Sequence, residues 1–119
     1  MGIIEKYDSF ISINPVMIEG NYDTKQVWIN SNQLYLEKSK AIFDHLATYF
    51  NWGSTGPGAA QLSLAILFEI TGNKRISMIL HHVFKNEFLA RMHQSDFKIT
   101  VNFGEWFEKH LEKDNMFLK

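Results

Sequence analysis

The sequence predicts an α+β fold in which a small, mainly antiparallel sheet packs against about four helices. The helices are expected to form a single layer around one apolar central helix. Two patterns support this expectation: β-rich runs precede residue 37, and apolar residues at helical spacing dominate the chain after it. The run Leu62–Ile70 is apolar nearly all round, which is typical of a central, buried helix.

Strands are expected first, over about 10–36. Val27–Asn30 and Gln33–Leu36 are β-rich and flank Ser31 and Asn32, which predicts a hairpin with its tip at these two residues. The segment Glu19–Asn21 reads as a turn. The short extended pieces before it contain Phe10, Ile13, Val16 and Ile18.

Four helices are expected after the hairpin, over about 37–50, 58–71, 74–92 and 103–113. The second begins near Pro57, because proline suits a first helical turn. Gly72 and Asn73 end it and cap the third helix. Before the last helix, Phe97, Ile99 and Val101 alternate with polar residues and predict a strand over about 96–101. Asn102 with Glu105 then matches a capping box.

Length and composition favour one domain over residues 1–119. A chain of 119 residues can bury a single core, and no linker-like stretch divides it. Twelve basic residues against thirteen acidic ones leave no basic face for direct nucleic-acid binding. The chain has no cysteine, which excludes disulfides and thiolate metal sites and fits a reducing compartment. We therefore expect a cytoplasmic protein without a membrane span.

The third expected helix carries two apolar stripes. The inner one includes Ile76, Leu80 and Phe84 at core spacing. A helix with a second stripe either lies between two layers or carries an interface. On the interface reading, the candidate partner-binding residues are Lys74, Met78, His82, Lys85, Leu89 and Met92.

The segment Trp52–Leu62 is rich in glycine and precedes the central helix. A helix N-terminus attracts anions, so the ligand-binding candidates are Gly53, Thr55, Gly56, Gly58 and Gln61. The segment lacks the lysine of a P-loop and follows a helix where a dinucleotide motif would follow a strand. The alternative is a tight turn between two helices under which Trp52 packs, with Gln61 as a cap or a buried hydrogen bonder.

The remaining chemistry-bearing residues suggest no catalytic set. The five histidines form no H-E-x-x-H pair, and the adjacent His81 and His82 are expected on different helix faces. Neither Ser54 nor Ser63 lies in a nucleophile elbow. We therefore expect no metal site, no cofactor and no enzymatic activity.

Eleven positions of the segment 52–67 resemble a family hallmark. They are Trp52, Gly53, Gly56, Gly58, Ala60, Gln61, Leu62, Leu64, Ala65, Ile66 and Leu67. The segment resembles W-G-Y-G-G-S-G-P-A-Q-L-A-L-A-I-L, the hallmark of an uncharacterised domain family of small bacterial, plasmid and phage proteins. Within the glycine-rich segment 52–62, the departures are Ser54 for Tyr, Thr55 for Gly, Pro57 for Ser and Ala59 for Pro. They remove part of any anion site, and the retained residues are those that a helix junction needs.

These observations favour a non-catalytic protein-interaction module of the mobile-element type. The resemblance implies an anti-defence role, such as anti-CRISPR or anti-restriction inhibition through binding of a host nuclease. The alternative is a small nucleotide- or phosphate-binding enzyme with its site at the glycine-rich segment. A third reading uses the aromatic residues of the sheet to stack nucleic acid. A homodimer is also compatible with the sequence.

Overall fold

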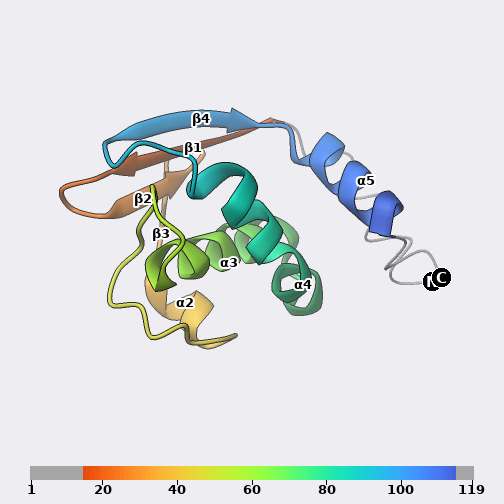
Figure 1. Cartoon of the computed structure of the whole chain (residues 1–119), viewed down its shortest axis with the longest axis horizontal. Helices are drawn as coiled ribbons and strands as arrows, with labels where there is room; N and C mark the ends of the chain where they lie inside the picture. The colour runs from red at the N-terminus through yellow and green to blue at the C-terminus, as the bar shows by residue number, and fades with distance from the viewer. Residues whose placement is uncertain (1–14, 115–119) are drawn as a thin grey trace. The chain divides into compact units, whose positions relative to one another are not determined.

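The structure is a computed structural model that describes residues 15–114, with side chains described for residues 15–110 (Figure 1). Two of the expected strand residues, Phe10 and Ile13, lie outside this part. The strands are β1 (Val16–Asn21), β2 (Gln26–Ile29), β3 (Asn32–Leu34) and β4 (Phe97–Val101). The helices are α2 (Leu36–Lys40), α3 (Pro57–Thr71), α4 (Lys74–Phe84), the π-helical turn η1 (Lys85–Leu89) and α5 (Phe103–Asp114). The predicted α+β class is confirmed.

The four strands form one sheet in the order β3–β2–β1–β4. The described residues divide into two compact units, one of residues 18–98 and one of residues 15–17 with 99–114. We describe each unit by itself, and the single domain over 1–119 stays a prediction. None of the described helices is long and apolar enough to cross a membrane.

Hairpin β2–β3 turns one residue earlier than the sequence predicts. Asn30 and Ser31 have positive φ angles of 47° and 70°, so they form the tip, and Asn32 already belongs to β3. Two consecutive left-handed residues match the twist of the flanking strands. The expected hairpin is therefore present, with its turn moved from residues 31–32 to residues 30–31.

The expected turn at Glu19–Asn21 is wrong, because these residues belong to β1. Gly20 pairs with Val27 of β2. A β-carbon on Gly20 would lie 2.9 Å from the ring of Trp52 and closer still to Phe97. Gly20 thus makes room for two aromatic rings in the core. The chain turns after it, at residues 22–25.

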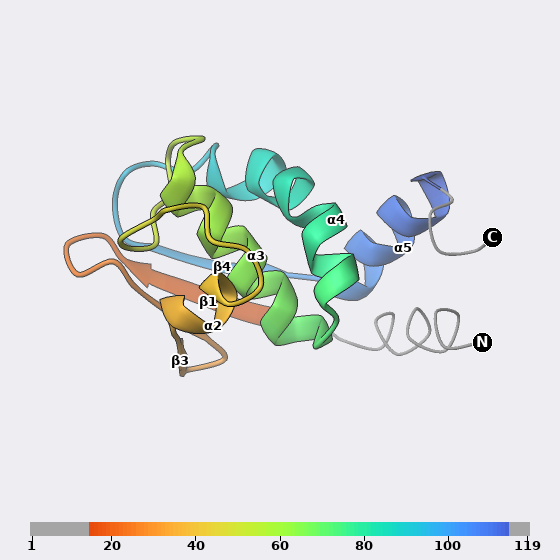
Figure 2. The same ribbon diagram turned by 90° about the horizontal axis from the view of Figure 1, so that it is seen from below.

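Helix α3 is the central helix that the sequence predicts. Every residue from Ala59 to Leu67 is buried. Gly72 ends the helix with a φ of 62°, and the Asn73 side chain accepts a hydrogen bond from the Ile76 amide at 2.9 Å. Both caps are therefore confirmed. In the two views, α2, α3 and α4 lie on the same side of the β1–β2 hairpin (Figures 1 and 2).

The expected helix over 37–50 is wrong beyond its first turn. Helix α2 ends at Lys40, and residues 43–47 have no regular structure. Polar side chains satisfy backbone groups that a helix would have paired. The Asp44 carboxylate accepts from the Leu46 amide at 2.7 Å, and the Lys40 ammonium donates to the Ala47 carbonyl at 2.9 Å. Aspartate favours such local bonds over helix continuation.

The expected helix over 74–92 changes its pitch after Phe84. In η1, the Ala90 amide donates to the Lys85 carbonyl five residues back, at 2.8 Å. A π turn holds more residues than an α turn, so the side chains after it are displaced around the helix axis. Leu89, expected on the outer stripe, is fully buried.

In the other unit, α5 begins as predicted. The Asn102 side chain accepts from the Glu105 amide at 3.0 Å, which confirms its role as N-cap. The inner face of α5 carries the buried residues Phe103, Trp106, Phe107 and His110. The ring centroids of Trp106 and His110 are 4.6 Å apart.

We predict that the glycines of the segment 53–58 differ in their tolerance of a side chain. A β-carbon on Gly58 would lie 2.6 Å from the Asn51 β-carbon and 3.0 Å from the Tyr49 carbonyl oxygen, whereas one on Gly56 meets only the Ser54 hydroxyl at 4.0 Å. Gly58→Ala should therefore cost about 2–3 kcal/mol of unfolding free energy. Gly56→Ala should cost less than about 1 kcal/mol. Urea denaturation measures both, and equal costs would contradict the packing role of Gly58.

Candidate functional site

The irregular segment 41–56, which joins α2 to α3, is held by one buried amide. The Gln61 side chain is 0% exposed, and its nitrogen donates to the Ser39 hydroxyl and to the Phe43 carbonyl, both at 3.0 Å. Its oxygen accepts from the His45 backbone amide at 2.9 Å. Both amide protons and the oxygen are therefore used. The interpretation of Gln61 as a buried hydrogen bonder explains its place in the sequence better than ligand binding does.

Leu46 directly follows His45, whose backbone amide donates to the Gln61 side chain. Its φ angle is +65°, and 83% of the residue is exposed. A left-handed conformation is unfavourable for a residue with a β-carbon, and an exposed leucine gains nothing from burial. The fold thus keeps Leu46 on the surface in a backbone conformation that costs free energy.

Other large apolar side chains are exposed near Leu46. Tyr35, Phe43 and Tyr49 are 61%, 47% and 52% exposed. Leu46 and Tyr49 line a depression of about 210 Å³, and Tyr49 and Tyr35 line a second one of about 230 Å³. The two depressions share Tyr49, so Leu46, Tyr49 and Tyr35 form one continuous surface, which we call the 35–49 surface.

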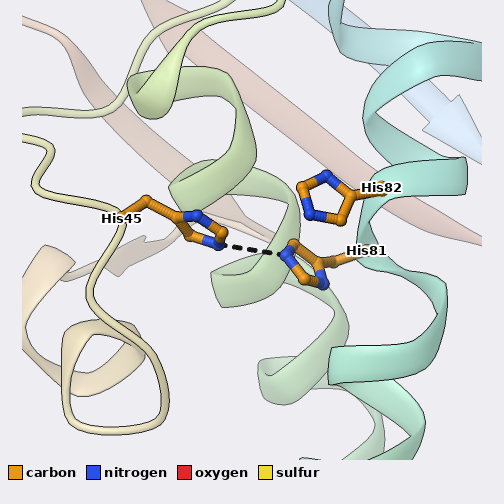
Figure 3. A group of neighbouring side chains, drawn as sticks. All are labelled: His45, His81 and His82. Carbon is orange, nitrogen blue, oxygen red and sulfur yellow. Dashed lines mark hydrogen bonds between the residues drawn. The ribbon is translucent and has the colours of Figure 1, made fainter.

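Three histidines meet beside the same segment. His45 projects from it toward His81 and His82 on α4 (Figure 3). The Nε2 atoms of His45 and His81 are 3.0 Å apart, and one ligand atom from each of the three rings lies within 4.8 Å of the others. The rings of His81 and His82 are 4.1 Å apart. The expectation that these neighbours diverge to different faces is therefore wrong.

The hydrogen bonds assign the protons within this cluster. Nδ1 of His81 lies 2.9 Å from the Met78 carbonyl oxygen, which can only accept. Nδ1 of the neutral ring therefore carries the proton, and Nε2 presents its lone pair toward His45. The His45 Nε2–H therefore donates to that lone pair.

Burial keeps these imidazoles neutral. It lowers the pKa of His81 to about 4, against the opposing hydrogen bond to the Met78 carbonyl, and the charges of His82 and His45 lower it further. The pKa of His45 is lowered by burial and then by His82 and Lys85, while Asp44 opposes the shift. The pKa of His82 is lowered by burial and by Lys85. A proton is thus disfavoured throughout the cluster.

The glycine-rich segment serves mainly as a junction. Gly53 has a φ of +75°, and its amide donates to the Leu89 carbonyl at 2.8 Å. The Trp52 ring is fully buried beside it and donates to the Ser95 carbonyl at 2.8 Å. Thr55 is exposed. Of the ligand-binding candidates, Gly56 and Gly58 line the smaller depression.

That depression is a poor match for phosphate. Among the described residues, no lysine or arginine lines it, and the amides of Ala59 and Ala60 both donate to the Gly56 carbonyl at 3.2 Å. A phosphate there would find neither a cation nor these two amides. A nucleotide- or phosphate-binding enzyme with its site here stays a prediction, and the residues of this depression do not favour it.

The partner-binding candidates on the third helix do not form one stripe. Lys74 and His82 are exposed, and Met78, Lys85 and Met92 are half-buried. Leu89 lies in the core, so we correct its assignment to a surface. Of this set, the structure brings only His82 into a cluster, with His45 and His81.

Sequence reasoning missed the histidine cluster and the exposed Leu46. No spacing rule connects residue 45 with residues 81 and 82, which come from different elements. The prediction of a helix over 37–50 also concealed the left-handed residue. The one available signal was Gln61, whose polar side chain is out of place in an apolar helix unless it has buried partners.

These features define an α+β protein with exposed apolar side chains on the segment 41–56 and a histidine cluster beside it. A family model described as a family of unknown function, DUF6166, matches residues 19–109. The chain belongs to this family, which confirms the predicted membership of an uncharacterised domain family. No curated protein and no solved structure matches the chain.

We predict that protonation of the cluster destabilises the fold. The pKa of His81 is about 4 in the folded chain against an ordinary 6.5. The unfolded chain therefore binds the proton first, and the unfolding free energy should fall as the pH drops from 6.5 toward 4, by up to about 1.4 kcal/mol per pH unit for this residue. Urea denaturation of chelator-treated protein at several pH values measures the slope.

Two variants test the assignment of this slope to His81. His81→Gln should reduce the slope, while His93→Gln, which changes an exposed histidine outside the cluster, should keep it. A slope that is the same in His81→Gln and the unchanged chain would contradict the assignment.

Proposed function

We propose that this protein is a non-catalytic interaction module that binds another protein through the 35–49 surface. The observation that carries the proposal is Leu46, 83% exposed at a φ of +65°. Strained residues that persist on a surface point to a function that uses them. Burial of such a side chain by a partner would recover about 1.5–3 kcal/mol.

The surroundings of Leu46 support a protein as the partner. Tyrosine and aliphatic side chains beside shallow depressions suit the apolar side chains that a partner projects. Tyr35 and Tyr49 supply aromatic area with a hydroxyl at the rim. The only lysine that lines either depression is Lys25, whose ammonium lies 2.9 Å from the Tyr22 ring centroid and 3.3 Å from the Asn51 side-chain oxygen. Gln33, Glu37 and Thr48 also line the larger depression, so polar groups offer contacts to a partner beside the aromatic rings.

This proposal moves the interface away from α4. The sequence places it on Met78, Lys85 and Leu89, but Leu89 is buried. That the partner is a nuclease of a host defence system follows only from the resemblance to plasmid and phage proteins, and it stays part of the proposal, as does a cytoplasmic location.

Leu46→Gly separates binding from folding. Glycine adopts a positive φ without strain, so the unfolding free energy should stay the same or rise. Binding to a partner captured from the host and then purified should weaken about 10- to 100-fold, because the buried leucine area is lost. Titration calorimetry measures binding, and urea denaturation measures stability.

Lys85→Glu on η1 is the matched control and should bind like the unchanged chain. Retained binding by Leu46→Gly, or its loss in Lys85→Glu, would refute the 35–49 surface. Light scattering measures whether a second copy of this chain, rather than another protein, binds the 35–49 surface. A dimer that Leu46→Gly converts to a monomer would replace the proposed partner by this chain itself.

A further inference from the structure

We propose that His45, His81 and His82 form a binding site for a divalent transition-metal ion of the class that prefers imidazole, with zinc as its representative. The site goes beyond partner binding and does not depend on it. It joins the irregular segment 41–56 to α4, since His45 comes from the segment and the other two histidines come from the helix (Figure 3).

The geometry of the nitrogen atoms fits such an ion. Zinc bonds to imidazole nitrogen at 2.0–2.1 Å, which places two tetrahedral ligand atoms about 3.3–3.4 Å apart. Nε2 of His45 and Nε2 of His81 are 3.0 Å apart, and the three ligand atoms lie within 4.8 Å of one another. Small side-chain rotations close the remaining differences. Three imidazoles leave one tetrahedral position for water or another ligand.

The hydrogen bond of the His81 ring is of the kind that metal-ligating histidines make. A ligating histidine almost always donates its other ring nitrogen to a carbonyl or carboxylate. Nδ1 of His81 makes this bond to the Met78 carbonyl at 2.9 Å, which leaves Nε2 to bind the ion. His81 is also 2% exposed, so its orientation is fixed by packing.

His45 is positioned for the ion by contacts that differ from those of His81. Its backbone amide is held by the buried Gln61 side chain at 2.9 Å, which fixes the backbone at this position. The ring itself packs edge-on against Phe43, with the ring centroids 4.7 Å apart. Its Nε2–H, which donates to His81 in the metal-free protein, must move to Nδ1 before the ion binds. Solvent water can take up the Nε2 proton and return one to Nδ1, because His45 is only partly buried. Among the charged residues that act on the cluster, Lys85 opposes the ion, and Asp44 favours it.

Zinc titration of the untagged chain tests the site. Equilibrium dialysis with zinc sulfate and metal analysis should show saturation at one ion per chain. His45→Ala and His82→Ala should each weaken binding at least tenfold, since even loss of a residue that only supports a ligand costs about 10- to 100-fold. Excess Mg²⁺ should not displace zinc, because Mg²⁺ prefers oxygen ligands.

His93→Ala is the matched control, as His93 is exposed and outside the cluster, and it should bind zinc like the unchanged chain. The variants at His45 and His82 avoid the buried His81, and circular dichroism checks that they fold. In nitrogen-detected spectra, the ring signals of His45, His81 and His82 should shift on titration while those of His93 stay. Unchanged zinc binding in both alanine variants, or no saturable binding, would overturn the proposal.

Discussion

The buried amide of Gln61 is the constraint on which the rest of the structure between α2 and α3 depends. A fully buried polar side chain on an apolar helix is costly unless each of its groups is paired. Here the pairing is with Ser39, Phe43 and His45. The segment cannot continue as a helix while it supplies these groups to Gln61. The bonds to the backbone of Phe43 and His45, together with those of Lys40 and Asp44, take groups that a longer helix would pair. They therefore fix the path of the chain toward Leu46.

Both proposed surfaces are consequences of that path. Fixing His45 at its backbone brings its ring to the two histidines of α4, and the next residue, Leu46, lies on the surface in a left-handed conformation. A metal ion on the histidines would add a second attachment of the segment to α4, close to the first one. The anchored segment thus contributes Leu46 and Tyr49 to the 35–49 surface and His45 to the histidine cluster.

The sequence predicted the elements whose signals are local. These elements depend on neighbouring residues, and each was confirmed. They are the apolar run of α3, the alternation in β4, and the caps at Gly72, Asn73 and Asn102. The prediction of a helix over 37–50 was wrong because Gln61, which is distant in sequence, bonds to backbone groups of Phe43 and His45. Leu89 was misplaced because the π turn of η1 changes the helical period. The histidine cluster was missed because His45 lies in the segment that is not helical, whereas His81 and His82 lie in the regular helix α4.

Amide hydrogen exchange at His45 tests the role of Gln61 most directly. If the buried side-chain oxygen accepts this proton, the His45 amide should exchange as slowly as the amides of α3, despite its irregular surroundings. The Leu46 amide, which donates to the exposed Asp44 carboxylate, serves as an internal reference and should exchange quickly. Gln61→Leu should bring His45 to the rate of Leu46. Rapid exchange of His45 in the unchanged chain would contradict the claim that Gln61 anchors this segment.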